Sequence, residues 1–141
     1  NGEEFKNFNS QDGMKIKLIK KNDMITAIIT GRSSNVVSIR ARELDIKEVY
    51  QGIDDKLEIL DKIKEKYSLS YEEISYIGDD LNDLAVLEKV GLSFSVKNAV
   101  QDVKERVDYV TEKRGGAGAV REAADLILES NKYFSGGENF D

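Results

Sequence analysis

The alternation of short β-rich runs with helical patterns constrains the fold of this chain more than any other feature of its sequence. Runs rich in β-branched and aromatic residues occur at 25–29, 48–50, 74–77, 92–96 and 109–111. Between them, apolar residues recur at helical spacing, most clearly at Leu57, Leu60, Ile63 and Tyr67. Strands and helices that alternate at these lengths form βαβ units, in which helices cover both faces of a parallel sheet. The sequence therefore predicts an α/β fold.

Polar residues and a glycine mark where several of the predicted helices begin and end. Ser70 and Glu73 have the spacing of a capping box. Asn98 offers a second N-cap, with Gln101 at the third helical position. Gly91 is expected to stop a short helix. These signals predict helix starts close to residues 70 and 98.

The two ends of the chain are less regular. We expect a strand or hairpin over 1–12 and a helix over 14–21, although the apolar residues of 14–21 also alternate as they would in a strand. A last helix follows the paired glycines at 115–116, and 132–141 is expected to be a flexible tail. In a chain of 141 residues, the remaining segment 1–131 fits a single domain.

The composition excludes several kinds of function. With 27 acidic and 21 basic residues the chain has a net charge of −6, which disfavours non-specific binding to nucleic acid or to an anionic membrane. It contains no cysteine and no histidine, which excludes disulfides, thiolate nucleophiles, Ser-His-Asp chemistry and histidine metal sites. No apolar stretch reaches the roughly 20 residues that span a bilayer, and no segment resembles a signal peptide. We therefore expect a soluble, cytoplasmic protein.

Three polar segments directly follow apolar runs, where ligand sites lie in sheets of this kind. Thr30-Gly31-Arg32-Ser33 follows the first run, 51–56 follows the second, and Asp79-Asp80-Leu81-Asn82-Asp83 follows the third. They offer a hydroxyl beside a backbone N–H, a lysine near a helix start and a cluster of carboxylates. Hard oxygens bind magnesium, while ammonium and hydroxyl donors neutralise phosphoryl oxygens. The three segments together can hold a phosphate group and its Mg²⁺ ion.

Each of these residues also has a purely structural interpretation. Thr30 could cap the helix that follows it, and Lys56 at a helix start could be a solvated charge. Asp79 and Asp80 could likewise be helix caps favoured by the helix dipole, and Asp83 could face solvent. One cap does not need three carboxylates, however. The presence of all three segments on one predicted edge therefore favours the functional interpretation.

The order of these segments resembles a known family. The order ITGR, then a lysine after QG, then GDDLND resembles motifs two, three and four of the haloacid dehalogenase-like phosphohydrolases. The resemblance extends along nearly the whole chain, through NGEEFKNFNSQDG, AIITGRSS, RARELDI, VYQGIDDK, YIGDDLNDL and GGAGAVRE. It implies a capless, Rossmann-like three-layer fold with a central parallel sheet. It also implies a magnesium-dependent phosphomonoesterase that acts on a sugar-acid phosphate and assembles as a homotetramer.

The family pattern implies roles for individual residues. Asp79 would be a direct magnesium ligand, with Asp80 and Asp83 in supporting roles around the metal and the lysine. Thr30 would hydrogen-bond the transferring phosphoryl group, and Lys56 would offset its charge. The resemblance also implies a reason for the collection of acidic residues after the third run, because a dication is expected among them.

The residues that would select the sugar follow less directly from the pattern. The substrate-binding candidates are Gly31, Arg32 and Asn82. Arg32, Arg40 and Arg42 could each bind a substrate carboxylate or be solvated helix residues, and we favour only Arg32 for substrate binding. Residues 1–12 resemble a projecting hairpin of the family, which in a tetramer reaches the active site of a neighbouring subunit.

One departure from the family pattern concerns the nucleophile. The nucleophile and the acid/base of the family are the aspartates of a DxD motif on a first, central strand. No apolar run followed by DxD occurs in these 141 residues, and Asp12-Gly13 lacks both the strand and the second carboxylate. We expect the chain to belong to a longer phosphatase that carries this strand. The alternatives are a shortened, non-catalytic sugar-phosphate-binding homologue and a receiver-like signalling domain, in which Lys113 would follow the last strand.

Overall fold

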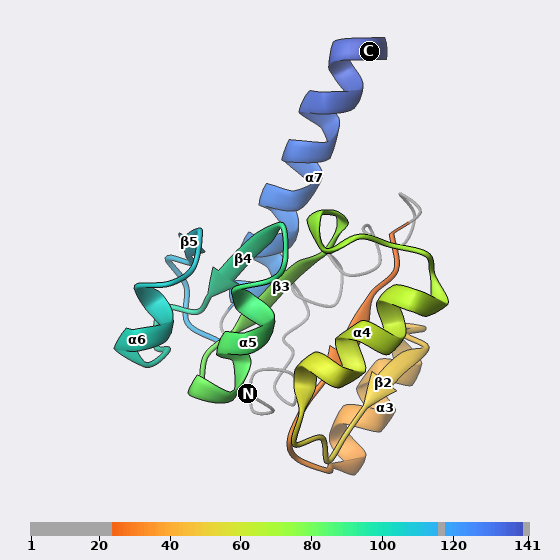
Figure 1. Ribbon diagram of the computed structural model, residues 1–141, viewed down its shortest axis with the longest axis vertical. Coiled ribbons are helices and arrows are strands. Elements are labelled where there is room, and N and C mark those ends of the chain that lie inside the picture. Colours follow the sequence, from red (N-terminus) through yellow and green to blue (C-terminus); the bar gives the residue numbers. More distant parts are fainter. Residues whose placement is uncertain (1–23, 116–117, 140–141) are drawn as a thin grey trace.

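The computed structural model describes residues 24–115 and 118–139, which form short strands separated by helices (Figure 1). The strands are β1 (Ala27–Ile29), β2 (Glu48–Tyr50), β3 (Ser75–Gly78), β4 (Leu92–Ser95) and β5 (Tyr109–Val110). The helices are α3 (Asn35–Glu43), α4 (Lys56–Lys66), α5 (Leu84–Leu87), α6 (Gln101–Lys104) and α7 (Ala119–Asn139). Two 3-10 turns complete the order, η1 (Tyr71–Glu73) and η2 (Leu81–Asp83). Every strand overlaps a predicted run, so the α/β prediction is confirmed.

Neighbouring strands pair in parallel throughout the described part of the chain. In one sheet β1 pairs with β2, with Ile28 opposite Val49. In the other sheet the order is β3-β4-β5, with Ile77 opposite Phe94. The family resemblance implied one central sheet. The described strands fall into two parallel sheets, with no ladder of backbone hydrogen bonds between β1 and β3 among them.

Helices cover both faces of these strands, as parallel strands with apolar side chains on both faces require. Ile28 packs with Val37 and Ala41 of α3. Ile29, the next residue, packs with Ile59 and Leu60 of α4. In Figure 1, α4 and α5 lie in front of the strands, and α3 and α7 lie behind them. Successive side chains of one strand therefore enter different helix layers, which gives the three-layer arrangement.

Side-chain caps fix where the two longer central helices begin. Ser34 caps α3, its hydroxyl accepting a hydrogen bond from the Val36 N–H at 3.2 Å. Asp55 caps α4 by accepting from the Glu58 N–H at 3.1 Å. Because Ser34 occupies the cap position, the interpretation of Thr30 as a helix cap is wrong.

The two caps predicted from sequence have different outcomes. The capping box of Ser70 and Glu73 is confirmed, although it heads only the single turn η1. The Asn98 cap is wrong, because α6 begins after Val100. Asn98 Oδ1 instead accepts a hydrogen bond from the Gly115 N–H at 3.0 Å. A side chain engaged with a distant loop does not cap its own helix.

A buried carboxylate joins the start of β2 to the end of α4. Glu48 is 4% exposed and accepts hydrogen bonds from Tyr50 Oη at 2.6 Å, from Lys66 Nζ at 2.7 Å and from the Tyr67 hydroxyl. The Lys66 ammonium, followed by the two hydroxyls, lowers the pKa of Glu48 from 4.5 to about 2, although burial alone would raise it. This network lies at the opposite end of β2 from the predicted ligand site.

The C-terminal helix extends further than the sequence predicted. α7 continues to Asn139, into the segment 132–141 that we expected as a tail. The elements predicted over 1–12 and 14–21 lie outside the described residues. In the described part of the chain, no helix has both the length and the apolar character needed to cross a bilayer.

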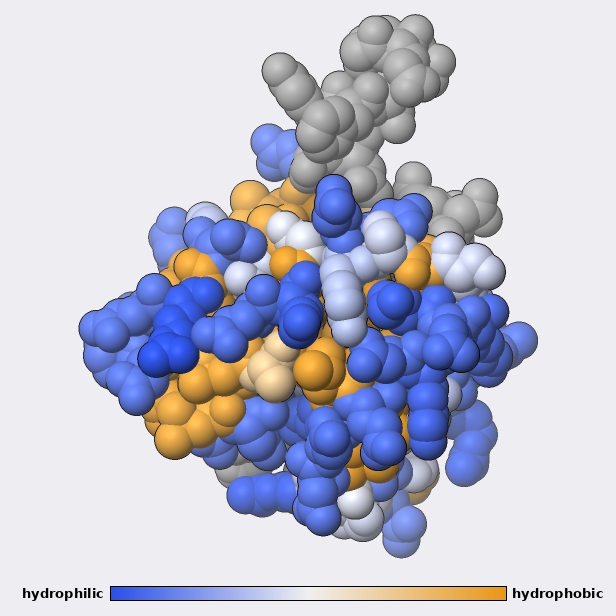
Figure 2. All heavy atoms as spheres, viewed as in Figure 1, coloured by the Kyte–Doolittle hydropathy of each residue, from blue (hydrophilic) through white to orange (hydrophobic). Residues whose placement is uncertain are grey.

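The face of the molecule shown in Figure 2 is mainly hydrophilic and carries several apolar areas. Among the residues whose side chains the structure describes, the exposed large apolar ones are Ile25, Val36, Ile39, Leu81 and Val100. Leu81 belongs to η2, in the acidic segment singled out from the sequence, and is 54% exposed. Apolar surface is therefore present beside the predicted site.

Candidate functional site

Thr30 lies at the carboxyl end of β1 and is fully buried. Its N–H donates to the Tyr50 carbonyl at 2.9 Å, and its own carbonyl accepts from the Ile53 N–H at 3.0 Å. Thr30 Oγ1 accepts a hydrogen bond from the Arg32 N–H at 3.2 Å. Because a hydroxyl both accepts and donates, the Thr30 proton remains able to donate to a ligand oxygen. Thr30 is thus fixed by its backbone while its side chain keeps a donor.

The loop between β2 and α4 is held against the loop that follows β1. Gln51 Oε1 accepts from the Ser34 N–H at 2.6 Å, and the Gln51 amide donates to Ser38 Oγ at 2.8 Å. Gly52 has a φ of +66°, and a Cβ there would lie 3.1 Å from Ser33 Oγ. Both the backbone conformation and the space therefore favour glycine at this position. These contacts join the two loops into one edge of the site.

Lys56 and Asp83 form a buried ion pair. Lys56 Nζ lies 2.8 Å from Asp83 Oδ1, and each side chain is 1% exposed. Asp83 Oδ1 also accepts from the Tyr76 hydroxyl at 2.8 Å, and Oδ2 accepts from the N–H groups of Asp79 and Asp80 at 3.1 and 3.2 Å. Each Asp83 oxygen therefore has two donors. The interpretations of Lys56 as a solvated charge and of Asp83 as a solvent-facing one are both wrong.

Gly78 makes room for the buried carboxylate. A Cβ on Gly78 would lie 2.7 Å from Asp83 Cβ and 2.9 Å from Asp83 Oδ2. Real Cβ atoms do not approach other atoms so closely, so any larger residue would displace Asp83. The glycine that ends β3 is therefore needed for the ion pair.

Asp79, Asp80 and Asn82 form the outer part of the site. Asp80 Oδ1 accepts from the Leu81 N–H at 2.7 Å, so the interpretation of Asp80 as a cap is confirmed for η2. Asn82 is exposed, and its Nδ2 lies 3.9 Å from the position that a Cβ would take on Gly31. The loops after β1 and β3 therefore meet at one edge, as the parallel arrangement predicted.

The donor set fits a magnesium ion that keeps few protein ligands. Within the described ranges, no group of three or more carboxylates comes together to hold a metal. Asp83 is engaged by Lys56 and Tyr76, which suits a supporting role beside the lysine. Asp79 and Asp80 remain the candidate ligands. Two carboxylates suffice for Mg²⁺, because waters and substrate phosphate oxygens usually complete its octahedral shell.

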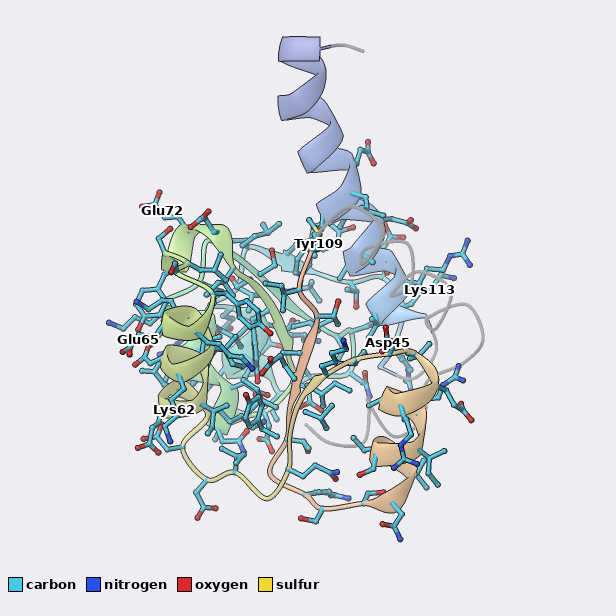
Figure 3. The ribbon with its side chains drawn as sticks, turned by 90° about the vertical axis from the view of Figure 1, so that its right-hand side faces the viewer. Asp45, Lys62, Glu65, Glu72, Tyr109 and Lys113 are labelled. Atoms are coloured by element: carbon cyan, nitrogen blue, oxygen red, sulfur yellow. The ribbon has the colours of Figure 1, made fainter. Side chains whose placement is uncertain are left out.

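The remaining cationic candidates lie on different elements. Arg32 is exposed in the loop after β1, whereas Arg40 pairs with Glu43 on α3 at 3.0 Å. Figure 3 places Lys113 beside the start of α7, and its N–H donates to Glu122 Oε1 of that helix at 3.0 Å. Arg32 is therefore the arginine that the structure places in a loop of the site.

Sequence reasoning missed the roles of two side chains that organise the site. Tyr76 donates to Asp83, and Gln51 joins two loops through both ends of its amide. A signal for Tyr76 was present, because residues two apart on a strand share a face and Gly78 touches the same carboxylate. The sequence carries no comparable signal for Gln51, whose partners lie 13 and 17 residues away.

Comparison with known proteins matches this chain over most of its length. Residues 3–123 match the family model of the haloacid dehalogenase-like hydrolases. The 3-deoxy-D-manno-octulosonate 8-phosphate phosphatase of Escherichia coli K12 is 46% identical over 128 residues, which are 91% of this chain and 68% of that protein.

Solved structures agree with the sequence comparison. The 3-deoxy-D-manno-octulosonate 8-phosphate phosphatase of Yersinia pestis superposes with a TM-score of 0.87 at 40% identity, covering 92% of this chain and 70% of that chain. The Moraxella catarrhalis phosphatase of the same name, solved with magnesium, phosphate and KDO, gives a TM-score of 0.84 at 39% identity over 95% of this chain and 83% of that chain. The chain therefore belongs to the haloacid dehalogenase-like hydrolases and has their α/β fold.

Proposed function

We propose that this protein is a magnesium-dependent phosphomonoesterase that hydrolyses 3-deoxy-D-manno-octulosonate 8-phosphate to 3-deoxy-D-manno-octulosonate and phosphate. The observation that carries the proposal is the convergence of Thr30, the buried Lys56 and the segment from Asp79 to Asp83 at one edge of the strands. The names of the Escherichia coli and Yersinia pestis relatives supply the substrate.

The proposed roles follow from the hydrogen-bonding capacity of each group. Thr30 keeps a hydroxyl proton that can donate to a phosphoryl oxygen. Lys56 uses one of its three ammonium donors on Asp83, which leaves two for the phosphate. Gly31, Arg32 and Asn82 line the rim and would contact the sugar acid. Together these groups position the phosphoryl group and offset its charge.

Magnesium binding is assigned to Asp79 and Asp80 in this proposal. The bound ion would neutralise phosphate charge during transfer. Asp83 supports the site without touching the metal, because it orients Lys56 and accepts the backbone N–H groups of both candidate ligands.

Phosphate release measures the proposed activity. The positioning groups named above do not supply an aspartate nucleophile, so we expect the 141-residue chain alone to release little phosphate. A version extended by a strand that carries the DxD motif should release phosphate from the 8-phosphate when magnesium is added. Robust turnover by the 141-residue chain would contradict the assigned roles. An extended version that binds the substrate but never hydrolyses it would favour the non-catalytic alternative.

Magnesium-dependent stability tests the metal ligands separately from catalysis. An ion at 100 times its dissociation constant stabilises a protein by about 2.7 kcal/mol, which raises the melting temperature by roughly 5–10 °C. Asp79→Ala should abolish this rise. Asp102→Ala, which removes an exposed acid of α6, should leave it unchanged. An unchanged magnesium response in Asp79→Ala would refute the assignment of the ligand.

A homotetramer in the cytoplasm, serving lipopolysaccharide biosynthesis, completes the proposal. The exposed Leu81 adjoins Asn82 at the rim, where a neighbouring subunit could cover it and help close the site. The absence of cysteine suits a reducing compartment. Light scattering at micromolar concentration should find a mass of four chains, and a monomer would remove the basis for subunit closure.

A further inference from the structure

Glu122, in the first turn of α7, holds the loop that follows β5. Its Oε1 accepts from the N–H groups of Glu112 and Lys113 at 2.9 and 3.0 Å. Its Oε2 accepts from the Tyr109 hydroxyl at 3.2 Å and lies 2.8 Å from the Glu112 nitrogen. Figure 3 shows Tyr109 and Lys113 beside the first turns of α7. Because these donors belong to β5 and its loop, Glu122 ties the helix to that loop through both of its oxygens.

The loop after β5 is held in turn against the loop after β4. Asn98 Oδ1 accepts from the Gly115 N–H at 3.0 Å, and the Lys97 N–H donates to the Lys113 carbonyl at 3.4 Å. The same carbonyl accepts from the Thr111 hydroxyl at 2.7 Å. The first two of these contacts cross between the loops, so the position of one loop sets the position of the other.

The loop after β4 reaches the acidic segment after β3. The Val100 N–H donates to the Asp79 carbonyl at 3.1 Å. On its other side, the Asp79 N–H donates to Asp83 Oδ2 at 3.1 Å. Both backbone groups of Asp79 are therefore held, one by the buried carboxylate and the other by the loop after β4. Mg²⁺ demands near-ideal octahedral geometry at about 2.0–2.1 Å, so a small displacement of a ligand lowers its affinity.

We propose that Asn98 and Glu122 are positioning residues for the magnesium site. Glu122 fixes the loop after β5, Asn98 passes that position to the loop after β4, and the Val100 N–H fixes the peptide of Asp79. Both side chains act on the metal through Asp79. The inference rests on the proposed role of Asp79 as a metal ligand and extends the site to two residues outside the acidic segment.

A purely structural role is the alternative, and the surroundings of the contacts separate the two. A hollow of about 510 Å³ lies beside them, and its lining includes Tyr109, Glu112, Lys113 and Glu122. Asn98, Glu112 and Lys113 are exposed. Water could therefore replace either side chain as the acceptor for these N–H groups, at little cost in enthalpy. Water would not hold the two loops at a fixed distance, so the variants should change metal affinity more than stability.

Isothermal titration calorimetry of the 141-residue chain measures the dissociation constant for Mg²⁺. Replacing a partner that orients a metal ligand typically changes metal affinity by about 10–100-fold. Asn98 and Glu122 act one step further out, so Asn98→Ala and Glu122→Ala should each raise the dissociation constant by about three- to tenfold. Their melting temperatures without magnesium should fall by no more than about 5 °C.

Two surface variants serve as matched controls. Gln101 is exposed at the start of α6 and bonds to Glu105, one turn further along the chain. Glu129 is exposed on α7, so Glu129→Ala removes the same charge as Glu122→Ala without touching the loop. Gln101→Ala and Glu129→Ala should leave the dissociation constant for magnesium unchanged.

A second measurement follows the contacts without any metal. Hydrogen exchange at the Val100 amide, measured by NMR without magnesium, should be at least about threefold faster in Asn98→Ala and Glu122→Ala, because the bond to the Asp79 carbonyl opens more often. Asn98→Asp keeps an acceptor for the Gly115 N–H. It should therefore retain slow exchange and bind magnesium at least as tightly as the unmodified chain.

The outcomes separate this proposal from the assignment of the metal ligand. An unchanged dissociation constant in Asn98→Ala, a loss of affinity that Gln101→Ala shares, or unchanged exchange at Val100 would each overturn the positioning role. Asp79→Ala is titrated in parallel. If it abolishes magnesium binding while Asn98→Ala and Glu122→Ala bind normally, the positioning role fails and the ligand assignment stands. If Asp79→Ala binds magnesium as the unmodified chain does, the ligand assignment fails and the positioning role fails with it.

Discussion

Replacing Asp83 by asparagine should destabilise the protein strongly, although the two side chains have nearly the same shape. Asparagine can keep its carbonyl oxygen at the position of Oδ2, where it accepts from the N–H groups of Asp79 and Asp80. Its NH₂ group then takes the position of Oδ1 and faces the Lys56 ammonium. Two donors would oppose each other in a site where both side chains are 1% exposed.

The expected magnitude follows from the burial of the pair. Removing one partner of a buried ion pair leaves an uncompensated charge, which lowers the free energy of unfolding by about 3–5 kcal/mol. For a chain of this size, that loss should lower the melting temperature by roughly 10–20 °C. Breaking the exposed pair of Arg106 and Glu88, whose side chains are 54% and 52% exposed, should change stability by less than about 1 kcal/mol.

Urea denaturation of four proteins measures the coupling directly. These are the unmodified chain, Asp83→Asn, Lys56→Met and the double variant, with Glu88→Gln as the surface control. Lys56→Met removes the buried charge that Asp83→Asn leaves without a partner. The double variant should therefore be more stable than the sum of the single effects predicts, by at least about 2 kcal/mol. Single effects below about 1 kcal/mol, or additivity within about 0.5 kcal/mol, would show that the pair is not held as described.

Two other contacts give predictions of defined sign. Glu48→Gln should lower stability at pH 7 by up to about 3 kcal/mol, reduced by solvent screening because Lys66 is 59% exposed. The pKa of Glu48 is depressed, so the stabilisation by its carboxylate is complete above pH 4.5 and is lost as the pH falls toward 2. Denaturation across this range should show the free energies of unfolding of the variant and the unmodified chain converging. A constant difference between them would contradict the network. Gly78→Ala should lower the free energy of unfolding by about 1–3 kcal/mol, because the added Cβ would press against Asp83. Gly31→Ala is the control: its Cβ would lie at an ordinary contact distance of 3.5 Å from the Ile53 carbonyl oxygen, so it should have little effect on denaturation. Equal effects of the two alanines would mean that Asp83 moves freely.

The strands and one helix cap could be predicted because their signals are local. Each apolar run of β-branched residues became a strand, and the Ser70 box formed as its spacing indicated. The Asn98 cap failed for a reason outside local sequence. Its side chain bonds to Gly115, and only the folded chain brings those residues together.

The burial of the site could not be predicted from the order of residue types. Lys56 and Asp83 are charged and lie in polar segments, so composition alone favours exposure for both. Their burial depends on pairing across 27 residues, on the hydroxyl of Tyr76 and on the missing Cβ of Gly78. The separation of β1 from β3 is likewise a property of pairing between strands, which hydrophobic patterns do not specify.

The acidic segment after β3 divides its work between neighbouring carboxylates, and two variants should separate these tasks. Asp83 faces inward with four donors, so Asp83→Asn should destabilise the chain whether or not magnesium is present. Asp79 is only partly buried and is the proposed metal ligand, so Asp79→Ala should mainly remove the added stability that magnesium gives. Thermal melts of both variants, with and without magnesium at about 10 mM, compare the two effects. This concentration suffices for a site that binds magnesium with a dissociation constant on the order of 1 mM or lower. If Asp83→Asn lost the magnesium response while keeping its stability, the carboxylate assigned to the lysine would instead belong to the metal.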